Sequence, residues 1–371
     1  MGFRTARPIR LAMAAVVAVV TPLLATPAAA EPLRDQQWYL DRIGIRQAHA
    51  AVEGDGVLVG MFLSSVDAGH PDLGGQVRPG RYVGSGGEVK ERPAELDTAA
   101  GRDVDTALAG LVVARGGDGV LGVAPRAQIQ PISGPVGEEK VSQALRWLVD
   151  QGAQVIDMSG GFTVDGDVES IDGVRYALAQ DVVVIMDARR ADRLPGSAST
   201  GVLVVGGITA KDERDGAASF DSRIDLSAPG ATLGLVGLAA GPSPDRRYAP
   251  IAAQGDMQAS AIVAGVAALV RARHPQLNAA SVIDRLLGTA QDLGPAGPDR
   301  TFGAGVVDAA AAVTTERPVV VENPLGDPGP PSVGLLDRVG GVALLAGALC
   351  CLVAVLAAVG VALSVARRRR R

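Results

Sequence analysis

Cysteine and histidine are both scarce in this chain of 371 residues. Its two cysteines, Cys350 and Cys351, are adjacent and lie inside a long apolar run near the C terminus. The rest of the chain therefore has no disulfide and no thiol that could bind a metal or act as a nucleophile. The chain has only three histidines, His49, His70 and His274. Any mechanism that needs an imidazole base must use one of them.

Basic residues are few in the central part of the chain. Of the 35 lysines and arginines, three lie in the first thirty residues and five at the C terminus, which leaves 27 against all 40 aspartates and glutamates. Residues 31–366 therefore carry a formal charge of −13. Binding to nucleic acid needs a basic surface that neutralises phosphates. We therefore expect no nucleic-acid partner.

The first thirty residues have the layout of a cleavable secretory signal. Arg4, Arg7 and Arg10 precede an apolar run over 11–24, and three small residues, Ala28–Ala30, follow it. A membrane anchor would need a longer apolar run than this one. We therefore expect residues 1–30 to be a signal peptide and the remainder to be exported.

The C-terminal part predicts one membrane span. Residues 339–366 carry no charge, and five arginines, 367–371, follow them. A helix of that length reaches about 42 Å, which is enough to cross a hydrocarbon core of about 30 Å. A basic tail favours the cytoplasmic side of the membrane. Residues 317–338 are rich in Pro and Gly, which predicts an extended linker between the span and a domain outside the cell.

Residues 31–316 have the composition of one compact domain. Within them, short runs rich in β-branched residues alternate with helical patterns at 141–152 and 172–180. These strand-like runs cover 56–63, 127–132, 153–159, 181–187 and 201–209. Strands that are apolar on both faces and separated by helices are typical of a parallel sheet with helices on both sides. The predicted fold class is therefore α/β.

Several segments carry a family resemblance by their order and spacing. They are QQWYLDRIGIRQAHAAVEGDGVLVGMFLSSVDAGHPDL (36–73), DTALAGLVV (105–113), SFDSRIDLSAPG (219–230), GDMQASAIVAGVAALV (255–270) and FGAGVVDAAAAV (302–313). By the order and spacing of these segments the chain resembles the subtilisin-like serine proteases. Among them it resembles the mycosins, which are membrane-anchored and associated with actinobacterial type VII secretion. The resemblance implies a subtilisin-like parallel sheet flanked by helices.

The resemblance also implies where four catalytic groups would lie, and this chain has other residues at all four positions. Leu63 stands at the position of the family's aspartate, Val104 at that of the histidine and Met257 at that of the serine nucleophile. Arg190 is the best match for the asparagine that stabilises the oxyanion. Leucine, valine and methionine can neither take up nor donate a proton. We therefore predict that the chain is catalytically inactive.

The remaining polar residues near these positions have less distinctive roles. The three histidines are expected to be structural, Ser260 to be a small packing residue, and Asp187, Arg189 and Arg190 to form a solvated cluster on a loop. Rebuilt catalytic groups would have to come from Asp67, Asp103, Asp105 and Asp256. Calcium loops of the family's kind are not recognisable, and we predict no metal and no cofactor.

Two binding functions follow from this pattern, with one enzymatic alternative. The resemblance implies docking to protein partners in the cell envelope, among them type VII secretion membrane components. A second hypothesis is a cleft that holds peptides without cutting them, in which Ser159 and Gly160 would lie along the bound chain. The enzymatic alternative is an active endopeptidase with rebuilt groups.

Overall fold

The computed structural model describes residues 33–329 except for 97, 118, 135–138, 161–167, 192–198, 216–222 and 241–246. The predicted signal peptide, span and basic tail lie outside this part of the chain. Among the helices that are described, none has both the length and the apolar character needed to cross a membrane.

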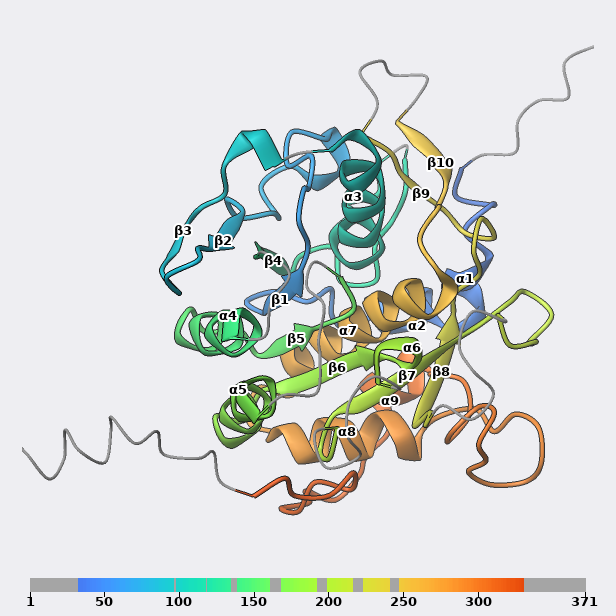
Figure 1. Ribbon diagram of the computed structural model, residues 1–371. Helices are drawn as coiled ribbons and strands as arrows, with labels where there is room; N and C mark the ends of the chain where they lie inside the picture. The colour runs from blue at the N-terminus through green and yellow to red at the C-terminus, as the bar shows by residue number, and fades with distance from the viewer. Residues whose placement is uncertain are drawn as a thin grey trace, which may run out of the picture.

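An eight-stranded sheet forms the centre of the molecule, with the strand order β3-β2-β4-β1-β5-β6-β7-β8 (Figure 1). All neighbouring strands are parallel except β2 and β3, which form an antiparallel edge. The strands are β1 (Leu58–Phe62), β2 (Arg81–Val83), β3 (Val89–Glu91), β4 (Gln128–Ser133), β5 (Val155–Asp157), β6 (Val183–Asp187), β7 (Leu203–Ile208) and β8 (Leu226–Pro229). A separate antiparallel pair consists of β9 (Val236–Leu238) and β10 (Tyr248–Pro250).

Helices cover both faces of this sheet, as the alternation of strands and helices predicts. The α-helices are α1 (Trp38–Arg42), α2 (Ile45–His49), α3 (Ala99–Val113), α4 (Glu139–Asp150), α5 (Val168–Ala179), α6 (Ala188–Ala191), α7 (Gly255–Arg273), α8 (Ala279–Gly288) and α9 (Ala309–Thr314). Two short 3₁₀ helices are η1 (Pro71–Leu73) and η2 (Ala94–Leu96). The α/β prediction is therefore confirmed, with each predicted strand within two residues of its observed bounds.

Successive residues of the strands enter two different apolar clusters, because side chains alternate between the faces of a sheet. In β6, Val183 and Ile185 belong to the cluster that includes α3, α7 and α8. Val184 and Met186 belong to the cluster that includes α4 and α5. The strands are thus buried on both faces, which is why they have no polar alternation in the sequence.

The central helix α7 packs closely because its inward side carries small residues. A Cβ at Gly265 would overlap the side chain of Val123, and Ala261, Ala264 and Ala268 are fully buried. Side chains of this size allow close packing around the helix, and at its start Gly255 meets Gly207 and Gly230, which lie in and directly after the strands β7 and β8. The close approach holds the first turn of α7 at the carboxyl ends of the neighbouring strands.

The described part of the Pro/Gly-rich segment, residues 317–329, is bound to the domain and is not a free linker. Residues 317–329 have no helix or strand, as predicted, but they lie along α8 and the turn before β7 and form hydrogen bonds with both. Composition alone predicts an extended chain, and it does not reveal the side chains of the domain that bind it.

Candidate functional site

Four elements bring the predicted positions to one edge of the sheet, where the parallel strands end. Leu63 follows β1 directly, and Arg190 lies in α6, directly after β6. Val104 is on α3, and Met257 is in the first turn of α7. Leu63 is buried, and Val104 and Met257 are half-buried against the same apolar cluster. The three positions predicted for the proton relay therefore hold only hydrocarbon and thioether side chains.

The first turn of α7 keeps a tightly specified backbone although its nucleophile position is a methionine. A Cβ at Gly255 would overlap both Asp215 Oδ2 and the carbonyl oxygen of Gly230, so only glycine fits there. Asp215 Oδ2 accepts a hydrogen bond of 3.1 Å from the backbone N–H of Gly255. A carboxylate at this position is favourable because helix N-termini carry unpaired N–H groups and a partial positive charge.

Asp256, the residue before Met257, is held inside the protein. Its Oδ1 accepts a hydrogen bond of 2.7 Å from Gly207 N–H, and Arg214 Nη1 lies 3.4 Å from the same oxygen. Burial raises the pKa of Asp256 to about 6, although the Gly207 N–H and the Arg214 charge act in the opposite direction. The side chain is 1% exposed. The contacts of Asp256 with Gly207 and Arg214 therefore stabilise the start of α7 in the protein interior.

All three histidines form hydrogen bonds with backbone groups. His49 Nε2 lies 2.8 Å from the carbonyl oxygen of Val123, and His274 Nε2 lies 2.9 Å from that of Val313. His274 ends α7, at the opposite end from Met257. His70 uses both ring nitrogens, Nδ1 to accept the backbone N–H of Asp72 and Nε2 beside the carbonyl oxygen of Arg247. These positions agree with the structural role that the sequence predicts.

Arg190 is not solvated, and in this the prediction of an exposed loop cluster is wrong. Its side chain is 13% exposed, and its Nε lies 3.4 Å from Oδ2 of the fully buried Asp187. Asp187 Oδ1 also accepts a hydrogen bond of 3.1 Å from the backbone N–H of Arg190. Burial raises the pKa of Asp187 to about 6, against the attraction of Arg190. The reason for the difference is that these residues form α6 directly after a buried strand.

Ser260 is a buried packing residue, as predicted, but it also forms a strong polar contact. Its Oγ donates a 2.7 Å hydrogen bond to Asp157 Oδ1, which also accepts the backbone N–H of Ser159 at 3.0 Å. Burial raises the pKa of Asp157, and the hydrogen bond from Ser260 opposes this shift. The hydroxyl is therefore engaged by a carboxylate and has no imidazole beside it.

Asp105 has a role that the sequence alone does not reveal. Its Oδ2 accepts the backbone N–H groups of Ser64 and Ser65 at 2.6 and 2.7 Å, directly after Leu63. The carboxylate thus comes from α3, one residue beyond Val104, and binds the loop that follows β1. The sequence gives little indication of this contact, because the two residues that form it are 40 positions apart in the chain.

The other acidic candidates bind separate backbone segments. Asp103 is exposed, and its Oδ1 accepts the N–H of Ala240 at 3.0 Å. Asp67 Oδ1 accepts the N–H of Gly69 at 3.2 Å. In the part of the chain that the structure describes, no group of three or more histidine, cysteine, aspartate or glutamate side chains is arranged to hold a metal ion.

The two residues predicted to line a peptide cleft are both buried. Ser159 is 1% exposed, and a Cβ at Gly160 would overlap the carbonyl oxygen of Phe62 and touch Leu63. Gly160 therefore packs against the end of β1. The segment that would continue the cleft, 161–167, lies outside the described residues.

Comparison with known proteins identifies relatives with this fold. Fervidolysin of Fervidobacterium pennivorans is 29% identical over 347 residues, which cover 82% of this chain and 48% of fervidolysin. This chain thus spans about half the length of fervidolysin. The crystal structure of fervidolysin matches with a TM-score of 0.63 and 26% identity, over 81% of this chain and 49% of that one.

Two further solved structures are similar over most of their length. The MycP3 protease from the type VII (ESX-3) secretion system matches with a TM-score of 0.59 and 25% identity, over 75% of this chain and 88% of that one. MycP1 with its N-terminal propeptide removed has a TM-score of 0.59 and 24% identity, over 76% and 98% of the two chains. The model of the subtilase family matches residues 54–305, which is more than half of this sequence. The chain belongs to the subtilase family.

Proposed function

We propose that this protein is a membrane-anchored, extracytoplasmic pseudoprotease that docks to, or stabilises, a type VII secretion assembly. The observation that carries the proposal is the replacement of the proton relay at its matched positions. Leu63, Val104 and Met257 lie at the carboxyl edge of the sheet against one apolar cluster. None of their side chains can accept a proton or attack a carbonyl carbon.

The chemistry of peptide hydrolysis in this family explains why the replacements matter together. A serine attacks the scissile carbonyl, a histidine takes its proton, and an aspartate orients the histidine. The three groups act as a unit, so the loss of one already removes most of the rate. Here all three are absent from the matched positions, and every histidine of the chain has a backbone carbonyl as a hydrogen-bond partner.

The alternative of rebuilt catalytic groups has little support in the geometry. Asp105 and Asp256 each accept backbone N–H groups, and Asp256 also faces Arg214. A carboxylate that is engaged in this way stabilises a loop or a helix end. The peptide-holding alternative is weakened in turn because Ser159 and Gly160 are buried.

The assignment to secretion rests on similarity and on the predicted ends of the chain. MycP3 is described as a protease of a type VII secretion system, and this chain matches 88% of it. The sequence adds an N-terminal signal, an apolar run at 339–366 and a basic tail. This combination favours a domain outside the cytoplasmic membrane with its tail inside, where the binding partners are envelope proteins.

A covalent probe tests the loss of catalysis. We would treat the full chain, extracted in mild detergent, with a fluorophosphonate that labels activated serines, and run an active subtilisin in parallel. No labelling is expected for this chain, whereas labelling of the subtilisin shows that the probe works. Clear labelling of a serine in this chain would overturn the pseudoprotease proposal.

A purification experiment tests the binding partner. After mild detergent extraction from the native membrane, the tagged full chain is expected to retain type VII membrane components. Recovery of secreted chains, without membrane components, would instead favour the peptide-holding alternative. A variant truncated before residue 339 serves as the control, because it keeps the domain and lacks the apolar run.

A further inference from the structure

The segment 317–329, which we call the strap, is bound along α8. The backbone N–H of Val320 donates to Ser281 Oγ at 3.0 Å, and its carbonyl oxygen accepts from Ser281 Oγ and from Asn278 Nδ2 at 3.0 and 2.8 Å. Arg317 forms an ion pair of 2.9 Å with Asp284, which is also on α8. The first part of the strap is therefore fixed to the domain by both backbone and side-chain contacts.

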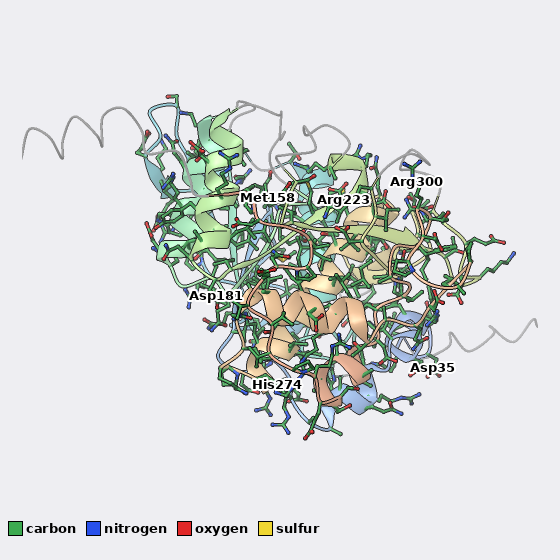
Figure 2. The ribbon with its side chains drawn as sticks, turned by 90° about the horizontal axis from the view of Figure 1, so that it is seen from below. Asp35, Met158, Asp181, Arg223, His274 and Arg300 are labelled. Atoms are coloured by element: carbon green, nitrogen blue, oxygen red, sulfur yellow. The ribbon has the colours of Figure 1, made fainter. Side chains whose placement is uncertain are left out.

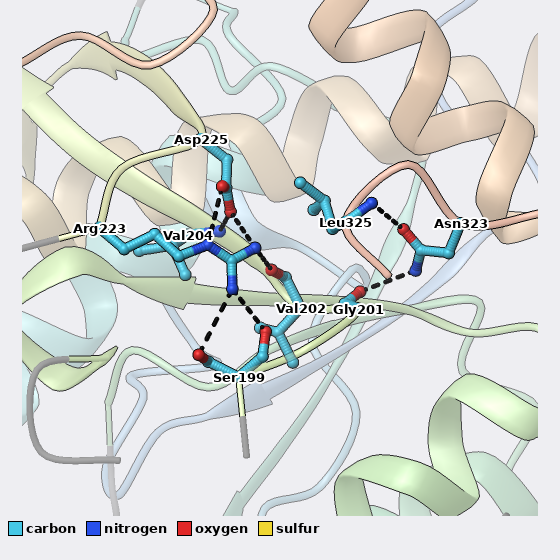
Figure 3. Close-up of polar contacts among 8 residues, drawn as sticks. All are labelled: Ser199, Gly201, Val202, Val204, Arg223, Asp225, Asn323 and Leu325. Atoms are coloured by element: carbon cyan, nitrogen blue, oxygen red, sulfur yellow. Dashed lines mark hydrogen bonds and ion pairs between the residues drawn. The ribbon is translucent and has the colours of Figure 1, made fainter. Parts of the chain in front are cut away.

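A second attachment holds the far end of the strap to the turn before β7. Asn323 Nδ2 donates to the carbonyl oxygen of Gly201 at 2.9 Å, and Gly201 N–H donates to the carbonyl oxygen of Leu325 at 3.1 Å. Arg223 holds this turn from its other side by donating to the carbonyl oxygens of Ser199 and Val202 (Figure 3). The strap thus binds a turn that the domain already keeps in place.

The contacts of Val320 with the start of α8 and those of Asn323 with Gly201 lie at the amino ends of the parallel strands. Gly201 precedes β7, and Asp181 precedes β6 and accepts the backbone N–H of Ala279 at the start of α8. Figure 1 shows the strap below α8, and Figure 2, which views the molecule from that side, shows Asp181 beside the helices. The candidate site lies at the carboxyl ends of the strands. Strands of five or six residues separate the two edges by about 17–20 Å.

The strap also exposes an apolar pair. Val319 is 64% exposed and Val321 is 86% exposed, and the only other large apolar residues exposed in the described part of the chain are Leu96 and Leu233. Val320, between them, is bound through its backbone. The two valines therefore flank a residue that is fixed to α8, and both keep most of their surface exposed.

The remaining length of chain limits the distance between the strap and the predicted span. Nine residues, 330–338, separate Gly329 from the apolar run that begins at Val339. An extended chain covers at most about 3.3–3.6 Å per residue, so Gly329 lies within roughly 36 Å of the start of the span. A linker that was free from residue 317 would allow more than twice that distance.

From these observations we infer that the strap edge of the domain faces the lipid surface, that Val319 and Val321 contact it, and that the candidate site faces away from the membrane. The inference rests on the proposed membrane anchoring and adds an orientation to it. The partner of the strap edge is a lipid bilayer. The outward edge, with Leu63 and Met257, is then the one available to envelope proteins.

Fluorescence quenching from labelled lipids tests this orientation. The full chain, with Cys350→Ser and Cys351→Ser, is reconstituted into phosphatidylcholine vesicles that contain lipids with a nitroxide on the headgroup. A bimane label is placed at Gln180→Cys, an exposed position directly after α5, whose last residue, Ala179, lines the same cavity as Asn323 of the strap. The control label is at Leu233→Cys, which is 62% exposed on the loop after β8. Quenching is expected at position 180, with the emission at position 233 unchanged.

A strap variant shows whether the strap causes the orientation. Ser281→Ala combined with Asn323→Ala removes side chains that bind both ends of the strap, and the quenching contrast between positions 180 and 233 is expected to be lost. An unchanged near-ultraviolet circular dichroism spectrum would show that this variant is folded. A contrast that persists in the folded variant would overturn the role of the strap.

Vesicle flotation separates failure of the inference from failure of the proposed anchoring. If the chain floats with the vesicles and position 233 is quenched as strongly as position 180, the orientation is wrong and the anchoring stands. If the chain does not float, the anchoring fails and the inference fails with it. Flotation with quenching confined to position 180 supports both.

Discussion

The buried carboxylate of Asp187 is predicted to make the protein less stable at neutral pH than at mildly acidic pH. The group is fully buried, and burial raises its pKa to about 6 despite the ion pair with Arg190. Between about pH 4 and pH 6 the folded state therefore holds a proton that the unfolded state has lost. Stability falls as pH rises through this window, because the folded state binds more protons there.

The size of the effect follows from the shift in pKa. A shift from 3.8 to about 6 is roughly two units, and each unit corresponds to about 1.4 kcal/mol, so Asp187 costs about 3 kcal/mol above pH 7. Asp256 has a pKa of about 6 for the same reason and adds a similar amount. Asp187→Asn removes the first contribution and leaves the second. The gain is smaller than 3 kcal/mol to the extent that Arg190 loses its partner.

Denaturant unfolding at several pH values measures this effect. The chain has two tryptophans, Trp38 on α1 and Trp147 on α4, so intrinsic fluorescence reports on the folded domain. Asp187→Asn is expected to be more stable than the parent at pH 7.5, to be similar at pH 4, and to depend less on pH than the parent, with the remaining dependence due to the other buried aspartates whose pKa is raised, Asp157, Asp225 and Asp256. Asp103→Asn is the control, because that carboxylate is exposed. An unchanged pH dependence in Asp187→Asn would refute the reasoning.

Three further substitutions test other parts of the structure. Gly160→Ala is expected to reduce the free energy of unfolding by about 1–3 kcal/mol, measured by denaturation, because its Cβ would overlap the carbonyl oxygen of Phe62; an unchanged stability would contradict this packing. Asn323→Ala is expected to cost about 1 kcal/mol by the same measurement, through the lost hydrogen bond to the turn before β7, and the neighbouring exposed Glu322→Ala is its control. Met257→Ser alone is expected to give no hydrolysis of a fluorogenic peptide, and detectable turnover would mean that a base lies within reach of position 257.

Much of the fold was predictable because it depends on local patterns. Strands such as 183–187 are apolar on both faces, and this is visible in the sequence because burial on both sides leaves no polar alternation. The order of the matched segments then predicted where Leu63, Val104 and Met257 would stand. The structure places these residues at one edge because parallel strands end together.

The polar contacts of the site were harder to predict because they join residues that are distant in the chain. Asp105 binds the loop after β1 across 40 positions, and Ser260 reaches Asp157 across 103 positions. Arg190 was expected in solvent because its neighbours are charged, whereas its side chain lies against Asp187. Residues 317–329 bind α8 through Asn278 and Ser281. The composition of the strap does not indicate these contacts, because the two side chains belong to another part of the chain.

The contacts of Asp105 also determine what a proton relay at this site would need. A family-type aspartate at position 63 would introduce a second carboxylate beside the one that already accepts the N–H groups of Ser64 and Ser65. Two carboxylates that share a site raise one another's pKa, and one of them then tends to stay protonated. A protonated carboxyl at position 63 would orient and stabilise an imidazolium at position 104 poorly. A working relay at this site would therefore require a change at Asp105 in addition to changes at positions 63, 104 and 257. The carboxylate that holds the loop after β1 thus disfavours proteolysis in a variant changed at those three positions alone.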